Sequence, residues 1–255
     1  MQSSQKVRLA IFDIDGTIFR SSLLIELFNE LVRRGVFPKK ASAEVERDYV
    51  AWLNRKGHYN DYLIKLVSVH YRYQTGCRVS QVEPAIRAVV AWQKDRVYRY
   101  TRDLVRSLKK KGYYLLAISN SPQSLVGKFA HEMGFHAAIG RELEVIKGKY
   151  TDRNMIDGQP VPTMGHIDKV AILKTFLTRH HLSADPAQSI MVGDSEGDLP
   201  LLSYVGHPIT FNPSGPLAHI ARRRGWKIVV ERKDVVYDIK DTALIPVSEK
   251  QRVRL

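Results

Sequence analysis

Short runs of consecutive apolar residues alternate with amphipathic segments over most of the chain. The apolar runs predict buried strands, because the strands of a parallel sheet are usually covered on both faces. Such runs lie at residues 7–12, 113–119, 189–194, 208–211 and 227–230. Helical spacing between them predicts helices at residues 98–111, 122–133, 166–180, 197–204 and 216–224. This alternation is typical of an α/β domain with a doubly wound parallel sheet.

One long segment departs from the alternation. Between the first two strands the chain carries little strand signal, and helical patterns follow one another at residues 21–34, 42–56, 60–74 and 81–95. We therefore predict a helical cap at residues 20–96, inserted into a core formed by residues 1–19 and 97–231. The stretch 141–151, "RELEVIKGKYT", predicts a small hairpin. Residues 232–255 are charged and weakly patterned, and we predict a C-terminal extension without assigned structure.

The composition places the chain among ordinary globular proteins. It has 255 residues, of which 44% are hydrophobic and 26% charged. No run approaches the roughly 18 consecutive apolar residues that a membrane span requires. The first residues do not have the pattern of a signal peptide. The single cysteine, Cys77, excludes an intrachain disulfide and suits a reducing compartment, so we expect a cytoplasmic protein.

The charge is strongly positive. Forty Lys and Arg residues against 26 Asp and Glu residues give a formal net charge of +14. Such a charge attracts polyanions, anionic membrane surfaces and phosphorylated small molecules. The basic residues are scattered between apolar positions, which favours solvated helix faces. No nucleic-acid-binding motif is present, so no specific nucleic-acid partner is expected, and an anionic membrane surface stays open as an alternative partner.

Polar side chains follow the predicted strands. In "RLAIFDIDGTIFRSS", residues 8–22, Asp13 and Asp15 come directly after the first apolar run. The other polar groups at strand ends or helix starts are Ser119, Asn120, Lys169, Asp194 and Asp198. Ligands of open α/β sheets bind beyond the carboxyl ends of the strands, so we expect these groups to meet at one edge. Several carboxylates in one crevice need a cation, and Mg²⁺ is the hard divalent ion that also binds phosphate.

These residue types fit phosphoryl transfer, which needs an in-line nucleophile, a proton donor for the leaving oxygen and positive charge around phosphate. Asp13 is the candidate nucleophile and forms an aspartyl-phosphate. Asp15 is the candidate acid and base, which protonates the leaving alcohol and then takes a proton from water. Asp194 completes the metal site. The candidate phosphate-binding residues are Ser119, Asn120 and Lys169.

The segments "DIDGT", "AISNS", Lys169 and "GDSEGD", in this order, resemble the four motifs of the haloacid dehalogenase superfamily. The run "GDSEGDLPLLSYVGHPITFNPSGPLAHIARRRGW" is similar to its phosphoserine-phosphatase-like branch, subfamily IB. The resemblance implies a Mg²⁺-dependent phosphomonoesterase with a cap after the first strand. It makes Asp13, Asp194 and the backbone carbonyl of Asp15 the metal ligands, and it places Asp198 next to them.

The sequence departs from that branch at three places. Ser21 and Ser22 stand near the position of a glutamate that recognises the substrate's amino group in phosphoserine phosphatases, and Glu26 follows a turn later. Asn120 replaces a glycine, and Gly197 replaces an asparagine. The phosphoserine specificity therefore does not transfer. Candidate specificity residues in the predicted cap are Glu26, Arg47, Arg55 and Arg72.

Two other functions stay open. A phosphotransferase or mutase would use the same aspartyl-phosphate but pass the phosphate to a second alcohol. The net charge is also compatible with a basic protein that binds phosphate or lipid phosphates with little turnover. The nine histidines have no H-x-x-x-H spacing, so we expect them to be structural.

Overall fold

The computed structural model describes residues 4–162 and 167–239 and divides the chain into two compact units. The first unit comprises Met1–Arg20, Val97–Ile118 and Asp168–Leu255. The second comprises Ser21–Arg96 and Ser119–Ile167. Most of the predicted cap, residues 20–96, thus falls into one unit together with the segment 119–167. The function of residues 20–96 as a cap stays a prediction.

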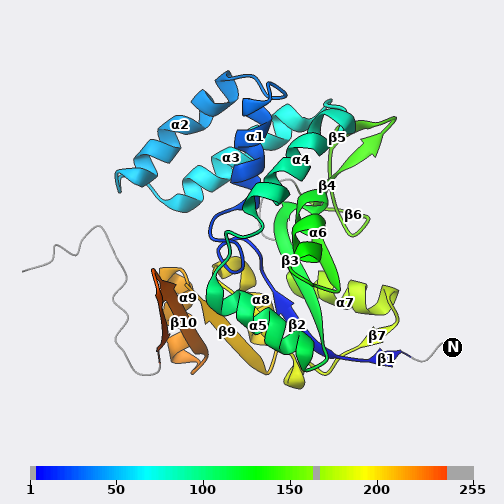
Figure 1. The fold of residues 1–255 in the computed structure, drawn as a ribbon, viewed down its shortest axis with the longest axis vertical. Coiled ribbons are helices and arrows are strands. Elements are labelled where there is room, and N and C mark those ends of the chain that lie inside the picture. The colour runs from blue at the N-terminus through cyan, green and yellow to red at the C-terminus, as the bar shows by residue number, and fades with distance from the viewer. Residues whose placement is uncertain (1–3, 163–166, 240–255) are drawn as a thin grey trace, which may run out of the picture. The chain divides into compact units, whose positions relative to one another are not determined.

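The first unit is built on a mainly parallel sheet (Figure 1). Its strands are β2 (Arg8–Phe12), β3 (Tyr113–Pro122), β8 (Ile190–Gly193), β9 (His207–Phe211), β10 (Lys227–Arg232) and β11 (Val235–Ile239). They lie in the order β11-β10-β9-β8-β2-β3, all parallel except β11, which pairs antiparallel with β10. The last four residues of β3 belong to the second unit. The predicted α/β fold with a parallel sheet is confirmed.

The connections of this sheet run in two directions. From β2 the chain returns through α5 (Arg99–Lys110) to β3 on one side of β2. From β8, on the other side of β2, the chain continues outward through α8 (Leu199–Tyr204) to β9 and through α9 (Gly215–Arg223) to β10. Crossovers between parallel strands are right-handed, so two crossovers that run in opposite directions along the sheet place their helices on opposite faces of it. The strand order thus reverses between β2 and β8, where doubly wound sheets bind their ligands.

The remaining elements of the first unit are helix α7, two short strands and two 3₁₀ turns. Helix α7 covers Lys169–Arg179. Short strands β1 (Gln5–Lys6) and β7 (Leu182–Ser183) pair in parallel. Single 3₁₀ turns lie at Pro186–Gln188 and Glu196–Asp198. Residue 166, where the sequence pattern began the helix of α7, lies outside the described residues.

The second unit combines helices with a hairpin. Its helices are α1 (Leu23–Arg33), α2 (Lys40–Leu53), α3 (Tyr59–Gln74), α4 (Val79–Gln93) and α6 (Gln123–Glu132). Strands β4 (Ala137–Ile146) and β5 (Lys149–Ile156) pair antiparallel, and β6 (Gln159–Pro160) pairs with β5. The hairpin turns at Lys147 and Gly148, both with positive φ, as a two-residue turn requires. The predicted hairpin is confirmed, and its strands extend beyond residues 141–151.

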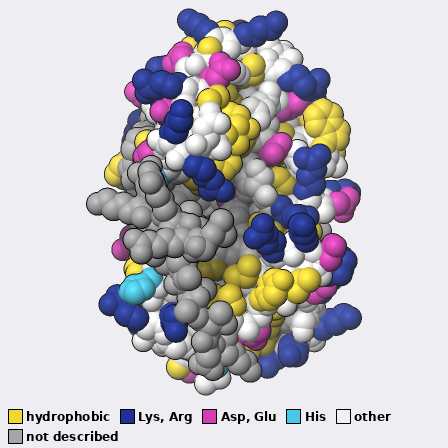
Figure 2. Space-filling view, turned by 90° about the vertical axis from the view of Figure 1, so that its left-hand side faces the viewer, with side chains coloured by type: hydrophobic (Ala, Val, Ile, Leu, Met, Phe, Trp, Pro, Cys, Tyr) yellow, Lys and Arg dark blue, Asp and Glu magenta, His cyan; other side chains and the backbone are white. Residues whose placement is uncertain are grey.

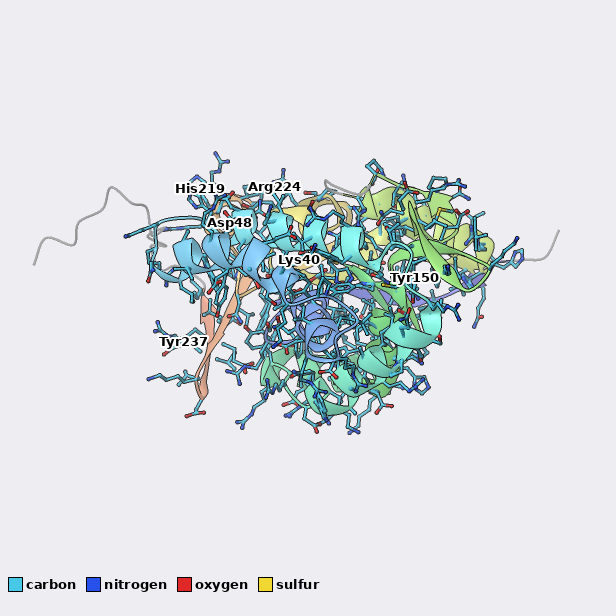
Figure 3. All side chains as sticks on the ribbon, turned by 90° about the horizontal axis from the view of Figure 1, so that it is seen from above. Lys40, Asp48, Tyr150, His219, Arg224 and Tyr237 are labelled. Carbon is cyan, nitrogen blue, oxygen red and sulfur yellow. The ribbon has the colours of Figure 1, made fainter. Side chains whose placement is uncertain are left out.

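The chain beyond residue 231 begins with a strand. Pairing with β10 orders β11, although most of its side chains are exposed. The side chain of Tyr237 extends outward from β11 and is 51% exposed (Figure 3). A strand of this kind has no buried face, which explains why its pattern in the sequence is weak. Residues 240–255 lie outside the described part.

Two further findings concern the surface and the helices. On the face drawn in Figure 2, basic side chains lie at several separate places among acidic and uncharged ones. Among the helices of residues 4–162 and 167–239, none combines the length and the apolar character needed to cross a membrane.

Candidate active site

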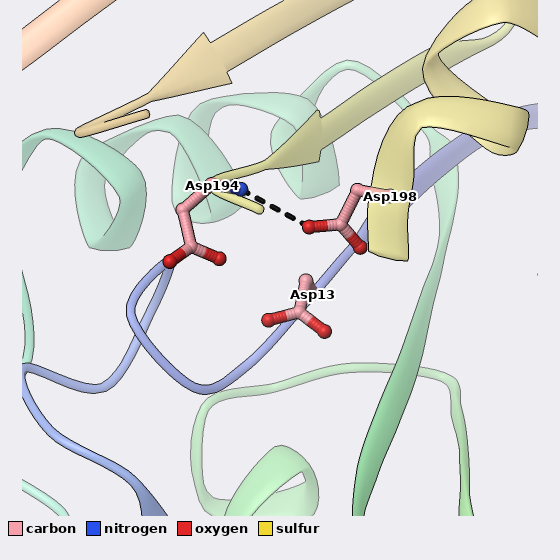
Figure 4. A group of neighbouring side chains, drawn as sticks. All are labelled: Asp13, Asp194 and Asp198. Atoms are coloured by element: carbon pink, nitrogen blue, oxygen red, sulfur yellow. Dashed lines mark hydrogen bonds between the residues drawn. The ribbon is translucent and has the colours of Figure 1, made fainter. Parts of the chain in front are cut away.

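Three aspartates meet at the carboxyl ends of β2 and β8 in the first unit (Figure 4). Asp13 follows β2, Asp194 follows β8, and Asp198 ends the 3₁₀ turn after β8. One carboxylate oxygen of each lies within 4.8 Å of the others. We call this group the acidic cluster. It lies where the strand order of the sheet reverses.

Lys169 holds two members of the acidic cluster together. Its Nζ donates to Asp13 Oδ1 at 2.8 Å, to Asp198 Oδ1 at 2.7 Å and to the Ile118 carbonyl at 3.0 Å. An ammonium has three N–H donors, so these bonds use all of them. The Lys169 residue is 2% exposed. A buried lysine with this arrangement fixes the position of both carboxylates.

The start of α7 determines where Lys169 lies. Asp168 is the N-cap, and its side chain accepts hydrogen bonds from the backbone N–H groups of Val170 and Ala171, both at 3.0 Å. This cap ends the preceding segment and begins the helix at Lys169. Lys169 is therefore the first residue of a rigid element, which limits the freedom of its long side chain.

Two glycines leave room for the carboxylates. Gly16 has φ +80°, and a Cβ at this position would lie against the Asp194 carboxylate. At Gly193 a Cβ would approach the Asp198 side chain to 2.6 Å. The glycines of "DGT" and "VGD" are thus required by the close approach of backbone and carboxylate.

Asp198 has both oxygens engaged by protein donors. In addition to the bond from Lys169 to Oδ1, its Oδ2 accepts from the backbone N–H of Asp194 at 3.1 Å (dashed in Figure 4) and of Ser195 at 3.2 Å. Asp194 accepts from Thr17 Oγ1 at 3.2 Å, and Thr101 Oγ1 donates to the Thr17 carbonyl at 2.8 Å. Asp198 therefore has the contacts of a group that orients the loop after β8.

The acidic cluster contains more negative charge than Lys169 balances. Burial raises the pKa of Asp13 to about 8; Lys169 opposes this rise, and the charges of Asp198 and Asp15 add to it. Burial and the neighbouring carboxylates raise the pKa of Asp194 well above its ordinary value. Burial lowers the pKa of Lys169, but Asp13 and Asp198 outweigh this and hold it above its usual range. The raised carboxyl pKa values express a repulsion that a bound cation removes.

The donor set fits a hard divalent cation. Carboxylate oxygens from three residues converge, and oxygen is the ligand atom that Mg²⁺ prefers. The lysine alone leaves two of the three charges uncompensated, which a divalent ion would neutralise.

The other predicted site residues lie as follows. Asp15 is half-buried in the loop after β2, which is closed by hydrogen bonds from Gly16 N to Phe19 O and from Ile18 N to Ile14 O. Ser119 and Asn120 lie at the end of β3, in the second unit. The structure thus brings Asp13, Lys169, Asp194 and Asp198 together in the first unit. Ser119 and Asn120 belong to the second unit.

Sequence reasoning missed three residues around these groups: Thr17, Thr101 and Arg141. Thr17 stands in the "DGT" stretch and its proximity to the aspartates could have indicated a role. Thr101 and Arg141 act on residues far away in the chain, namely Thr17 and Asn120. No local pattern marks such contacts.

Comparison with known proteins agrees with this geometry. Residues 10–203 match the family described as haloacid dehalogenase-like hydrolase. The chain is 28% identical over 134 residues to "Phosphoserine phosphatase SerB1" of Mycobacterium tuberculosis, covering 52% of this chain and 41% of that protein. It is 25% identical over 224 residues to "Histidinol-phosphatase" of Neisseria meningitidis, covering 87% of this chain and 97% of that protein.

A solved structure shows the same fold. The structure named "Phospho-Aspartyl Intermediate Analogue of Phosphoserine phosphatase" has a TM-score of 0.57 and 22% identity, covering 90% of this chain and 96% of that one. The chain spans less than half the length of the first mycobacterial relatives that it matches. The family match covers most of the chain, from β2 to α8. The protein therefore belongs to the haloacid dehalogenase-like hydrolase family.

Proposed function

We propose that the protein hydrolyses the phosphate monoester of a small metabolite, with Mg²⁺ and through an aspartyl-phosphate on Asp13. The observation that carries this proposal is the acidic cluster bound by Lys169 at the reversal of strand order. Family membership supports the reaction class. A buried carboxylate beside an ammonium and further carboxylates is suited to attack on phosphorus once a cation neutralises the excess charge.

The two steps use Asp13 and Asp15 in turn. An oxygen of the Asp13 carboxylate attacks phosphorus, and the bond between phosphorus and the alcohol oxygen breaks. The Asp15 carboxyl group gives its proton to that leaving oxygen. Asp15 then takes a proton from a water molecule, whose oxygen attacks phosphorus, so that phosphate leaves and the Asp13 carboxylate is restored.

The other residues bind and orient. Lys169 holds one Asp13 oxygen at 2.8 Å and keeps the carboxylate in a fixed orientation. Ser119, Asn120 and Lys169 are the proposed phosphate-binding residues: Ser119 and Asn120 would donate hydrogen bonds, and Lys169, whose three N–H groups contact Asp13, Asp198 and the Ile118 carbonyl, would attract the phosphate through its positive charge. Mg²⁺ would be held by Asp13, Asp194 and the Asp15 carbonyl, and it would supply positive charge to the phosphoryl oxygens. Asp198 would keep Lys169 and the loop after β8 in place.

The named relatives suggest a substrate class. Phosphoserine and histidinol phosphate, the substrates in the names of two relatives, are both phosphate esters of primary alcohols with a neighbouring amino group. In the second unit, Glu26 is a candidate partner for such an amino group. It is half-buried, Gln93 Nε2 donates to its Oε2 at 2.8 Å, and burial raises its pKa. We therefore place amino-alcohol phosphates first among the substrates to be tested.

The test is phosphate release from a panel of phosphomonoesters. It contains p-nitrophenyl phosphate, phosphoserine, histidinol phosphate, sugar phosphates, nucleotides and lysophosphatidate, each with Mg²⁺ and with EDTA. We expect turnover with Mg²⁺ that EDTA abolishes. Turnover unaffected by EDTA would contradict the role of the metal. Folded protein that binds Mg²⁺ and hydrolyses nothing would contradict the phosphatase and favour a phosphotransferase.

A further inference from the structure

A buried arginine of β4 contacts Asn120 in the second unit. Arg141 is 4% exposed. Its Nε donates to Asn120 Oδ1 at 3.3 Å, and its Nη1 donates to the Pro162 carbonyl at 2.6 Å. Arginine keeps its charge even when buried. The molecule thus uses a buried cation to hold an amide side chain that is itself exposed.

The contact determines which way the Asn120 amide faces. A guanidinium group only donates hydrogen bonds, so the oxygen of the amide must face Arg141. The Nδ2 group, with two N–H donors, then lies at the other end of the planar amide, in a different direction from Arg141. The neighbours Ser119 and Ser121 are 1% and 2% exposed, whereas Asn120 is exposed. The Asn120 amide is therefore an oriented donor at the end of β3.

Strand β4 packs closely against residues 121–123. Gln123 Nε2 donates to the Ala138 carbonyl at 3.2 Å, and Gln123 Oε1 accepts from the Gly140 N–H at 2.5 Å. A Cβ on Gly140 would lie 2.6 Å from the Ser121 carbonyl, so only glycine allows this approach. Arg141 is the next residue of the strand. Its side chain therefore starts from a backbone that is already fixed against residues 121–123.

We propose that Arg141 is a positioning residue that orients the Asn120 amide as a hydrogen-bond donor to the phosphate group of the substrate. This inference rests on the proposed phosphatase function and adds a residue that the sequence did not mark. In this role Arg141 acts through Asn120 and does not itself contact the phosphate. A hydrogen bond to a charged acceptor of this kind contributes about 10- to 100-fold to binding.

The test compares Asn120→Ala, Arg141→Met, Arg141→Lys and the double variant Asn120→Ala/Arg141→Met. Steady-state kcat and KM are measured with p-nitrophenyl phosphate and Mg²⁺, together with inhibition by inorganic phosphate. Asn120→Ala and Arg141→Met should each raise KM and the inhibition constant of phosphate about 10- to 100-fold. Arg141→Lys keeps a donor and should lie between Arg141→Met and the wild type.

The double variant separates positioning from a general structural role. If Arg141 acts through Asn120, the double variant should be no worse than Asn120→Ala alone. The matched control is Arg153→Met, an exposed arginine of β5 that pairs with Glu144, and it should leave both constants unchanged.

Three results would overturn the inference. An unchanged KM and an unchanged inhibition constant of phosphate in Asn120→Ala would exclude the phosphate contact. An equal effect of Arg141→Met in the wild-type and Asn120→Ala backgrounds would show that Arg141 acts otherwise. Absence of Mg²⁺-dependent turnover in the wild type would overturn the proposed function as well, whereas an active wild type with an unaffected Asn120→Ala would overturn the inference alone.

Discussion

Two regions of the molecule, the acidic cluster in the first unit and the aromatic surroundings of His70 in the second, bury polar groups in opposite ways. In the first unit, Asp13, Asp198 and Lys169 are buried and charged groups contact one another at 2.7 and 2.8 Å. In the second unit, His70 is fully buried among aromatic rings, with the Phe37 and Tyr71 ring centroids 5.5 Å away. Burial lowers the pKa of His70 to about 4 and keeps the ring neutral.

The difference between the two regions is that one buries charged groups and the other buries a neutral ring. Burying ions is costly unless they are paired, and a network that still contains excess negative charge is retained where a cation or a reaction needs it. A neutral ring in an aromatic cluster only packs. We therefore expect changes in the acidic cluster to affect activity and stability together, and changes around His70 to affect stability alone.

The largest effect is expected for Asp13→Asn. The amide keeps the size of the side chain but is a poor nucleophile, so turnover should fall about 10⁴-fold or more. Circular dichroism should show an unchanged fold, because the substitution removes a charge from a crowded site. The control is Asp103→Asn on the exposed side of α5, which should keep full activity. Full activity of Asp13→Asn would contradict the assignment of Asp13 as the nucleophile.

A smaller but still large effect is expected for Lys169→Met. It leaves Asp13 and Asp198 without their ammonium partner, and the free energy of unfolding should fall by about 3–5 kcal/mol. Urea unfolding in EDTA measures this loss. Lys174→Met, at an exposed position of the same helix, should change it by less than about 1 kcal/mol. Equal effects of the two variants would show that the buried pairs do not stabilise the fold.

Acid should lower the free energy of unfolding through His70 in the second unit. The unfolded chain protonates His70 with its ordinary pKa of 6.5, whereas the folded protein does so only near pH 4. Between these values the unfolded state binds more protons, so the free energy of unfolding falls as the pH falls. From pH 7 to pH 5 the loss due to His70 is about 2 kcal/mol.

His70→Phe isolates this contribution. The variant keeps an aromatic ring but has no titrating group, so its loss of stability between pH 7 and pH 5 should be smaller than that of the wild type by about 2 kcal/mol. Urea midpoints at the two pH values measure the difference. His131→Gln, at an exposed position of α6, is the control for removing a histidine. The same pH dependence of stability in His70→Phe and the wild type would show that His70 is not the source of the loss.

The smallest effect is expected at a half-buried carboxylate outside the acidic cluster. The Glu231 side chain accepts hydrogen bonds from the backbone N–H groups of Arg99 at 3.0 Å and Tyr100 at 2.8 Å, at the start of α5. Glu231→Ala removes both bonds, and the free energy of unfolding should fall by about 1 kcal/mol. Glu231→Gln keeps one acceptor and should lose less. Thermal unfolding compares the two, and an unchanged Glu231→Ala would show that the helix start needs no cap.

Much of the fold follows from local sequence. The continuous apolar runs of β2, β3 and β8 give the parallel strands, because burial on both faces removes polar positions from them. The hairpin of residues 141–151 also follows from local sequence, because glycine at position 148 readily adopts the positive φ that a two-residue turn requires. Strand β11 was not predicted, because Val235, Val236 and Tyr237 are exposed and only pairing with β10 orders them.

The site was predictable only in part. The rule that parallel strands end at one edge is enough to predict that Asp13 and Asp194 meet. The partners that hold the acidic cluster and the loop after β2 come from far along the chain: Asp198 for Lys169 and Thr101 for Thr17. Such contacts depend on how strands and loops pack, which no short stretch of sequence contains.

The most direct test of the proposed reaction is to trap the phosphate on Asp13. The protein would be mixed with p-nitrophenyl phosphate and Mg²⁺ and quenched with borohydride, which reduces an acyl phosphate to the alcohol. Mass spectrometry of the peptide containing residues 8–20 would then identify the modified residue. We predict homoserine at Asp13, only with substrate and not in Asp13→Asn. Turnover without any modification at Asp13, or with modification at another residue, would contradict the account.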